Sequence, residues 1–213
     1  MLCHSFFKKF FIGILAVWAS LFFLSGAWAD DVNPPDWADG PNTVVAFWED
    51  HGNGLVLDDW YIDDFSGYPL TGENNGEPGL EIFANLYTFF MPNFIDPLPV
   101  KHLRIQVTYF GNDLLFPKIT SIAGHDSMPP GDVQGIFKDH VVDNALTPGA
   151  LYFYEDWIMF PNPDWEAIDI FVPDTVQLQE VVIDTISTVP IPSAIILFAS
   201  ALGGLGFLGR RKK

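Results

Sequence analysis

The sequence predicts an all-β protein, in which antiparallel strands form a β-sandwich of the jelly-roll type. Polar and apolar residues alternate in many short runs, which is the pattern of strands with one buried face. Pieces rich in Gly and Pro separate these runs, and few windows keep a helical period for twelve residues. Many short strands with such turns between them are typical of sandwiches and jelly rolls.

The most regular alternation lies in His102–Tyr109. Leu103, Ile105, Val107 and Tyr109 would point to one side of this strand, and the polar residues between them to the other. We therefore expect the four apolar side chains to face the core.

Weaker alternation of the same kind predicts six further strands. These segments are Thr43–Trp48, Asp59–Phe65, Leu80–Phe90, Ala150–Phe160, Ala167–Val172 and Val176–Thr185. All seven lie between Asp30 and Thr188, a length that suits one domain with its own core.

Residues 1–29 have the features of a secretory signal peptide. A basic start is followed by the apolar segment Phe10–Leu24, and Ala27 and Ala29 are the small residues that signal peptidase requires. Cleavage is expected before Asp30, so the chain is predicted to be exported.

Charge and cysteine content narrow the function of the exported part. The chain carries 27 acidic residues against 10 Lys and Arg, and all the acidic ones fall in residues 30–188. Such a field disfavours nucleic acid and favours divalent cations or neutral partners. The only cysteine, Cys3, lies in the predicted signal peptide, so neither disulfides nor a cysteine-based zinc site are expected outside the cell.

The C-terminal residues 189–213 have three parts in a fixed order. A Pro-rich turn comes first, an uncharged apolar run (residues 194–208) follows, and a basic tail ends the chain. As a helix the apolar run would span about 22 Å, a short transmembrane helix. The basic tail would stay in the cytoplasm by the positive-inside rule. The turn and tail residues are Val189, Pro190, Ile191, Pro192, Ser193, Arg210, Arg211, Lys212 and Lys213.

This order resembles the PEP-CTERM sorting signal of Gram-negative bacteria, in its VPLPA-like form. The resemblance implies a transient single-pass stay in the inner membrane and processing by an exosortase-type enzyme. Transfer to the cell surface or the extracellular polysaccharide matrix would follow. Ile191 stands where the commonest form has an acidic residue, which leaves the exosortase subtype open. An ordinary single-span tail anchor or a terminal core helix is the alternative.

Four carboxylates beside an aromatic pair are candidate metal ligands. Asp58, Asp59, Asp63 and Asp64 could supply the hard oxygen atoms that Ca²⁺ prefers. Their spacing matches neither an EF-hand loop nor a Gly-rich calcium repeat. Solvated strand ends are the alternative interpretation of the same residues.

Two tryptophans beside acidic residues are candidates for glycan binding. Trp48 and Trp157, if exposed, could stack on the apolar face of a sugar ring. Filling of the sandwich core is the alternative role for each ring.

No arrangement of residues predicts catalysis. The histidines are scattered, and the sequence shows neither a helical metal-binding motif nor a nucleophile elbow. We therefore expect a non-enzymatic exported protein without a cofactor other than Ca²⁺, and a carbohydrate-binding module is the alternative.

Overall fold

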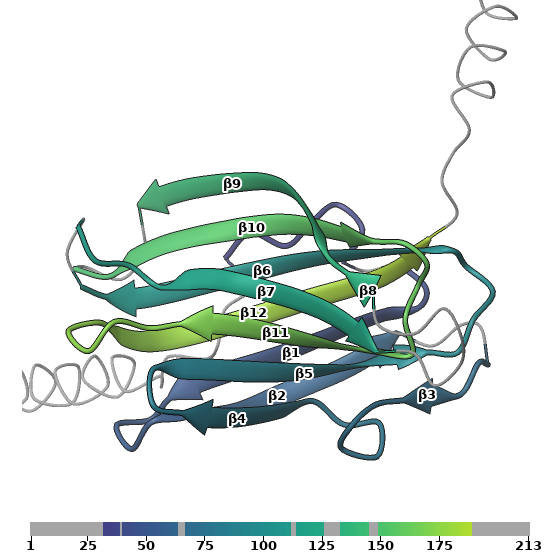
Figure 1. Ribbon diagram of the computed structural model, residues 1–213, viewed down its shortest axis with the longest axis horizontal. Coiled ribbons are helices and arrows are strands. Elements are labelled where there is room, and N and C mark those ends of the chain that lie inside the picture. Colours follow the sequence, from purple (N-terminus) through teal and green to yellow (C-terminus); the bar gives the residue numbers. More distant parts are fainter. Residues whose placement is uncertain are drawn as a thin grey trace, which may run out of the picture. The chain divides into compact units, whose positions relative to one another are not determined.

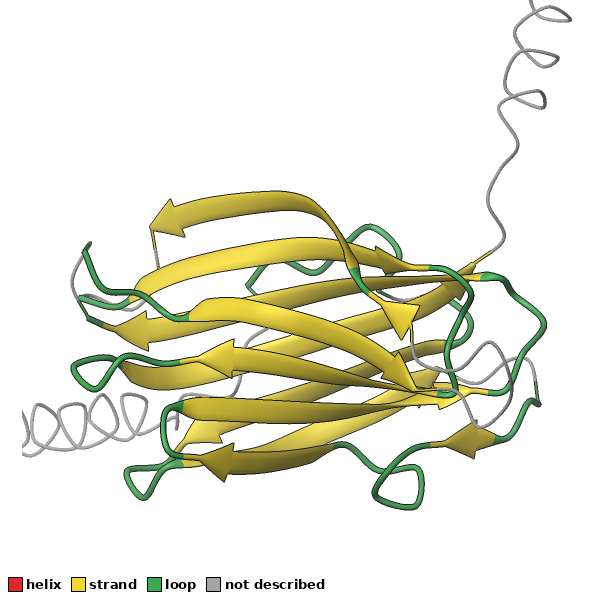
Figure 2. Ribbon diagram, in the orientation of Figure 1, coloured by secondary structure: helices red, strands yellow, loops and turns green. Residues whose placement is uncertain are grey.

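Two antiparallel sheets face each other across a shared apolar core in the computed structural model of the chain (Figure 1). The structure describes residues 32–38, 40–63, 67–111, 114–125, 133–144 and 149–188. Within these ranges the regular structure is all strand, with no helix (Figure 2). The predicted all-β sandwich is confirmed.

The first sheet has the strand order β2-β1-β12-β6-β10-β9. Its strands are β1 (Thr43–Asp50), β2 (Leu55–Asp63), β6 (Val100–Phe110), β9 (Ile136–Asn144), β10 (Leu151–Met159) and β12 (Gln177–Thr188). The last strand of the chain therefore lies inside the sheet, between β1 and β6.

The second sheet has the order β3-β5-β11-β7-β8, and β4 also pairs with β5. Its strands are β3 (Leu70–Thr71), β4 (Gly79–Phe83), β5 (Leu86–Phe94), β7 (Lys118–His125), β8 (Val133–Gln134) and β11 (Trp165–Phe171). Neighbours in both sheets run antiparallel.

The inward face predicted for His102–Tyr109 is confirmed. Leu103, Ile105, Val107 and Tyr109 are all buried in the core, and they lie on β6. Alternation along an extended strand places them on one side, where the second sheet covers them.

Side chains from the two sheets interdigitate in the core. Trp48 of β1 meets Phe89 of β5 edge to face, with 4.9 Å between the ring centroids. Ile168 of β11 and Ile183 of β12 are buried in the same cluster. Burial of this apolar surface is the main stabilising term of the fold.

The opposite face of β6 is covered by the segment that precedes β1. The backbone N–H of Asn33 donates to Gln106 Oε1 at 2.9 Å, and Arg104 Nη1 donates to the Asn33 carbonyl at 3.1 Å. Arg104 also forms two hydrogen bonds of 2.7 Å with Asp156, which raise the pKa of its guanidinium. The polar alternate residues of β6 therefore form a network between the sheet and the N-terminal segment.

Two features of the strands differ from the prediction. Leu80–Phe90, expected as one strand, is split between β4 and β5 by a turn in which Ala84 has a φ of 52°. The strands β3, β7, β8 and β9 were not predicted at all. The remaining predicted strands coincide with β1, β2, β6, β10, β11 and β12 to within a few residues at their ends.

Both predicted membrane signals lie outside the described residues. In the described part of the chain, no helix has the length and apolar character needed to cross a membrane. The last described residue is Thr188, which ends β12 opposite Val100 of β6.

Candidate functional sites

Two groups of ionisable and polar side chains stand out in the sandwich. The hairpin cluster consists of Glu49, His51 and Asp58, next to the turn between β1 and β2. The buried cluster consists of Asn93, Lys101 and Glu166, between the two sheets.

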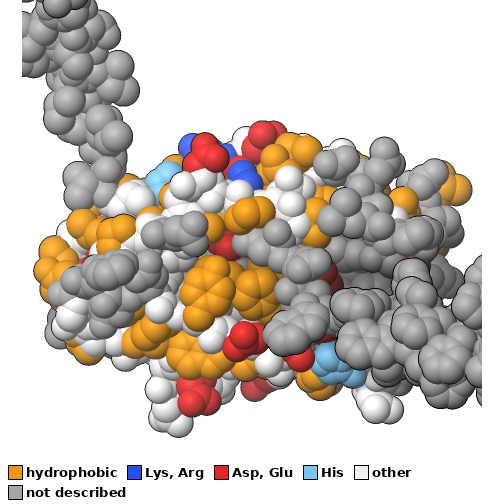
Figure 3. All heavy atoms as spheres, turned by 180° about the vertical axis from the view of Figure 1, so that it is seen from behind, with side chains coloured by type: hydrophobic (Ala, Val, Ile, Leu, Met, Phe, Trp, Pro, Cys, Tyr) orange, Lys and Arg blue, Asp and Glu red, His pale blue; other side chains and the backbone are white. Residues whose placement is uncertain are grey.

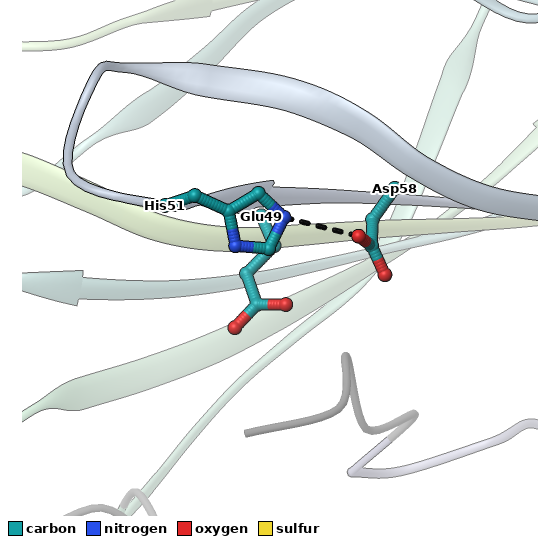
Figure 4. Close-up of side chains that lie close together, drawn as sticks. All are labelled: Glu49, His51 and Asp58. Atoms are coloured by element: carbon teal, nitrogen blue, oxygen red, sulfur yellow. Dashed lines mark hydrogen bonds and ion pairs between the residues drawn. The ribbon is translucent and has the colours of Figure 1, made fainter. Parts of the chain in front are cut away.

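The hairpin cluster is brought together by a β-bulge. Phe47 pairs with Asp59, but Trp48 already pairs with Leu57, so Asp58 is the extra residue of β2. One ligand atom from each of Glu49, His51 and Asp58 lies within 4.8 Å of the others, and the three side chains converge in Figure 4. His51 Nε2 and Asp58 Oδ1 are hydrogen-bonded at 3.0 Å.

Asp50 fixes the turn that carries His51. Its Oδ1 accepts hydrogen bonds from the backbone N–H groups of Gly52 (2.7 Å) and Gly54 (3.0 Å). Both glycines have positive φ, which a residue without Cβ adopts at low cost. Gln177 Nε2 donates to Asp50 Oδ2 at 2.7 Å, and this bond is the main cause of a lowered Asp50 pKa.

The predicted set of four calcium ligands does not converge. Asp58 and Asp63 lie five residues apart on one extended strand, a separation of about 16 Å, so they cannot bind the same ion. Asp59 accepts a hydrogen bond from the N–H of Trp60 at 2.8 Å, and Asp64 lies outside the described residues. Instead, Asp58 meets an imidazole and a second carboxylate, a donor set closer to that of Zn²⁺ than of Ca²⁺.

The two candidate glycan-binding rings have different positions. Trp48 is fully buried in the core, so its predicted exposure is wrong. It shares the inward face with Val44 and Ala46, and this alternation outweighs the acidic residues that follow it. Trp157 is partly buried, and its Nε1–H donates to Glu155 Oε2 at 3.0 Å. Glycan binding by Trp157 stays a prediction.

The buried cluster joins the two sheets at one end of the core. Lys101 is on β6 of the first sheet, whereas Asn93 and Glu166 are on β5 and β11 of the second. All three have zero exposure to solvent. Lys101 Nζ donates to Asn93 Oδ1 at 2.6 Å and lies 3.8 Å from Glu166 Oε1.

The Asn93 carboxamide is held at both ends. Its Oδ1 also accepts from the N–H of Phe94 at 2.8 Å and from the Ser187 hydroxyl at 3.4 Å. Its Nδ2 donates to Asn162 Oδ1 at 2.8 Å and to the carbonyl of Pro163 at 2.5 Å. Because two acceptors surround the nitrogen, the oxygen must face Lys101.

Glu166 is the least satisfied member of the cluster. Within the described ranges neither of its carboxyl oxygens has a hydrogen-bond partner. Burial raises the pKa of Glu166 to about 7, and the nearby Lys101 opposes this rise. Burial also lowers the pKa of Lys101. Both groups are therefore shifted toward their neutral forms.

The buried cluster was not predicted, although the alternation of residues along β6 and β11 contains the signal. Lys101 is separated from Leu103 and Ile105 by an even number of positions, and the same holds for Glu166 with Ile168 and Ile170. Each charged residue thus occupies an inward position of its strand. Each also lies one residue before a predicted strand, His102–Tyr109 or Ala167–Val172.

A surface hollow of about 300 Å³ lies beside β6, β9 and β10. Its lining includes Trp37, His102, Lys138 and Asp156. Burial lowers the pKa of His102, and Arg104 already engages both oxygens of Asp156. Neither Ser, Thr nor Cys is among the described residues that line the hollow.

Comparison of the chain with models of protein families, with curated proteins and with solved structures gives no match. The functional proposal therefore depends on this chain's own residues and their placement.

Proposed function

We propose that the chain is a non-enzymatic, exported bacterial surface or extracellular-matrix protein. Residues 1–29 are its signal peptide, residues 30–188 its exported domain, and residues 189–213 a PEP-CTERM-like sorting signal with a transmembrane helix at 194–208. An exosortase-type enzyme processes the tail while the domain stands outside the inner membrane.

The point at which the fold ends supports this division. β12 is hydrogen-bonded on both sides, to β1 and to β6, up to the last residues before the Pro-rich turn. Thr188 still pairs with Val100, and the turn begins at Val189. Loss of residues 189–213 would therefore remove no strand from the sheets and leave the described core intact.

The strand order supports a jelly-roll-like assignment for the exported domain. The order β1-β12-β6-β10 in one sheet faces β5-β11-β7-β8 in the other. First and last strands thus lie side by side, and successive strands of these eight lie in opposite sheets except β7 and β8, as in two nested Greek keys.

The negative charge of the chain supports a partner other than nucleic acid. On the face of the molecule seen in Figure 3, acidic side chains occur in several separate places, whereas Lys and Arg gather in one. The chain has a net charge of −17. A neutral extracellular polysaccharide is compatible with this field, whereas an anionic partner is repelled.

Fractionation of host cells tests the proposed sorting. The variant with both Pro190→Ala and Pro192→Ala changes the turn but no residue of the described sheets. We expect the wild-type chain to leave the inner membrane and the double variant to stay there with its tail attached. Pro34→Ala, a change at an exposed proline before β1, is the matched control and should behave as wild type. Release of the double variant at the wild-type level would contradict the proposal.

A further inference from the structure

We propose that Lys101 and Asn93 form an amide bond with each other, so that a covalent cross-link joins the two sheets. The Lys101 side-chain nitrogen replaces the Asn93 amide nitrogen, and ammonia is released. Glu166 carries the proton. This modification concerns the folded domain and does not depend on how the chain is sorted.

The reacting atoms are already in contact. Lys101 Nζ lies 2.6 Å from Asn93 Oδ1. Because Oδ1 is bonded directly to Cγ, Nζ lies at most about 3.8 Å from this carbon. Reacting atoms in productive complexes are about 3–3.5 Å apart, so a small rotation of the lysine side chain suffices.

The surroundings convert the lysine into a nucleophile. An exposed lysine is protonated at neutral pH and has no free electron pair, whereas Lys101 is entirely buried. Burial lowers its pKa and raises that of Glu166 to about 7. The proton of the ammonium group can therefore move to the carboxylate 3.8 Å away, which leaves a neutral amine.

The surroundings also activate the carboxamide. Attack on Cγ places negative charge on Oδ1, where the Phe94 N–H and the Ser187 hydroxyl already donate. Donors fixed at this position stabilise the developing oxyanion among side chains that have no exposure to solvent. Glu166, with neither oxygen hydrogen-bonded within the described ranges, is free to exchange protons.

The reaction is balanced without an oxidant or cofactor. The neutral Lys101 amine attacks Asn93 Cγ, and an N–C bond forms. Glu166, which holds the proton taken from the Lys101 ammonium group, transfers it to Nδ2 and accepts a second proton from the attacking Lys101 nitrogen. The Cγ–Nδ2 bond then breaks, ammonia leaves, and Glu166 remains protonated.

The position of the cluster suggests what the cross-link does. Lys101 pairs with Ser187, and the next residue pair is Val100 with Thr188, where β12 ends (Figure 1). The cross-link would thus join the sheets at the end from which the C-terminal tail departs. The exported part has no cysteine, so a disulfide cannot serve there.

A test is provided by the chain's only Asp-Pro bond, Asp96–Pro97, which lies between the two residues. Mild acid cleaves this type of bond selectively in denatured protein. In the full chain purified from its host, we expect the two acid fragments to stay joined and to weigh less by one ammonia. Asn75–Gly76 can also lose ammonia by cyclising, so joined fragments, and not mass alone, decide the result.

Substitutions of Lys101 and Glu166 test the role of each residue in the reaction. Lys101→Arg keeps the positive charge but has no nucleophilic amine, so its acid fragments should separate. Glu166→Gln should also yield separate fragments. Glu155→Gln is the matched control, since burial raises the pKa of Glu155 too, but the residue bonds with His140 and Trp157. It should keep the cross-link.

The wild-type chain decides the proposal without any variant. Separate acid fragments from the folded wild-type protein would overturn it. Loss of water instead of ammonia, with the bond at Glu166, would overturn the assignment of Asn93. A cross-link that persists in Glu166→Gln would remove Glu166 from the reaction.

Discussion

The buried cluster and the hairpin cluster contain similar groups in opposite surroundings. In the hairpin cluster the side chains of His51 and Asp58 are 51% and 37% exposed, whereas Lys101 and Glu166 are fully buried. Two charges 4 Å apart interact by about 1 kcal/mol in bulk water and about 4 kcal/mol at an effective dielectric constant of 20. Burial, and not the type of residue, therefore distinguishes a surface ion pair from a site in which the pKa values are shifted.

Removal of one partner from the buried cluster should have the largest effect. Lys101→Met leaves the buried Asn93 carboxamide and Glu166 carboxyl without the Lys101 nitrogen that lies beside both. We expect a loss of about 3–5 kcal/mol in the free energy of unfolding at neutral pH, measured by denaturant titration. The double variant Lys101→Met with Glu166→Leu removes both buried ionisable groups and should recover most of this loss. A single variant as stable as wild type would contradict the argument.

The stability of the domain should fall as the pH rises from about 4.5 to about 7. In the folded state Glu166 stays protonated up to a pKa of about 7, whereas in the unfolded chain it ionises near 4.5. The unfolded state binds fewer protons in this window, so its free energy falls relative to the folded state. The contribution is on the order of 3 kcal/mol.

Glu166→Gln isolates this contribution from that of the other carboxyl groups. The slope of unfolding free energy against pH should become less negative across the window in this variant. An identical slope in both proteins would show that Glu166 is ionised in the folded state.

A Cβ at Gly124 should disturb the same end of the core. Gly124 pairs with Glu166, and an added Cβ would lie 2.6 Å from atoms of Met159 and Pro163. We expect Gly124→Ala to cost about 1–3 kcal/mol, as overpacking does. Ala123→Gly, at the neighbouring position of β7, is a control for the backbone change. Equal stability of Gly124→Ala and wild type would show that this end is loosely packed.

Changes in the hairpin cluster should have the smallest effects. His51→Ala or Asp58→Ala should alter the free energy of unfolding by less than about 1 kcal/mol, because exposed pairs contribute little. Saturating Ca²⁺ should leave the melting temperature unchanged, since two carboxylates and an imidazole fall short of six to eight oxygen ligands. A rise in melting temperature with Ca²⁺ that Asp58→Ala abolishes would restore a calcium site to this hairpin.

Alternation of residues predicted the strands with a strong period and failed elsewhere for identifiable reasons. The inward face of β6 follows from its sequence because every second residue is apolar. β9, an edge strand, was missed because apolar and polar residues come in blocks along IFKDHVVDN and do not alternate. The turn between β4 and β5 was missed because Ala84 adopts a positive φ without a nearby Gly or Pro signal.

The candidate sites depended on contacts that a linear pattern does not contain. Asp58 meets His51 only because a bulge adds a residue to β2. Asn93 and Glu166 lie on neighbouring strands of one sheet, but only the packing of the two sheets brings Lys101 to them. Alternation along each strand could have predicted that these side chains face the core. Only the folded structure shows that they lie close together.

The intact mass of the protein isolated from its own host tests the proposed function most directly. We expect a chain that begins at Asp30, lacks the basic tail that ends at Lys213, and is found outside the inner membrane. A chain in the inner membrane that retains Lys213 would contradict the account and indicate an ordinary tail-anchored domain.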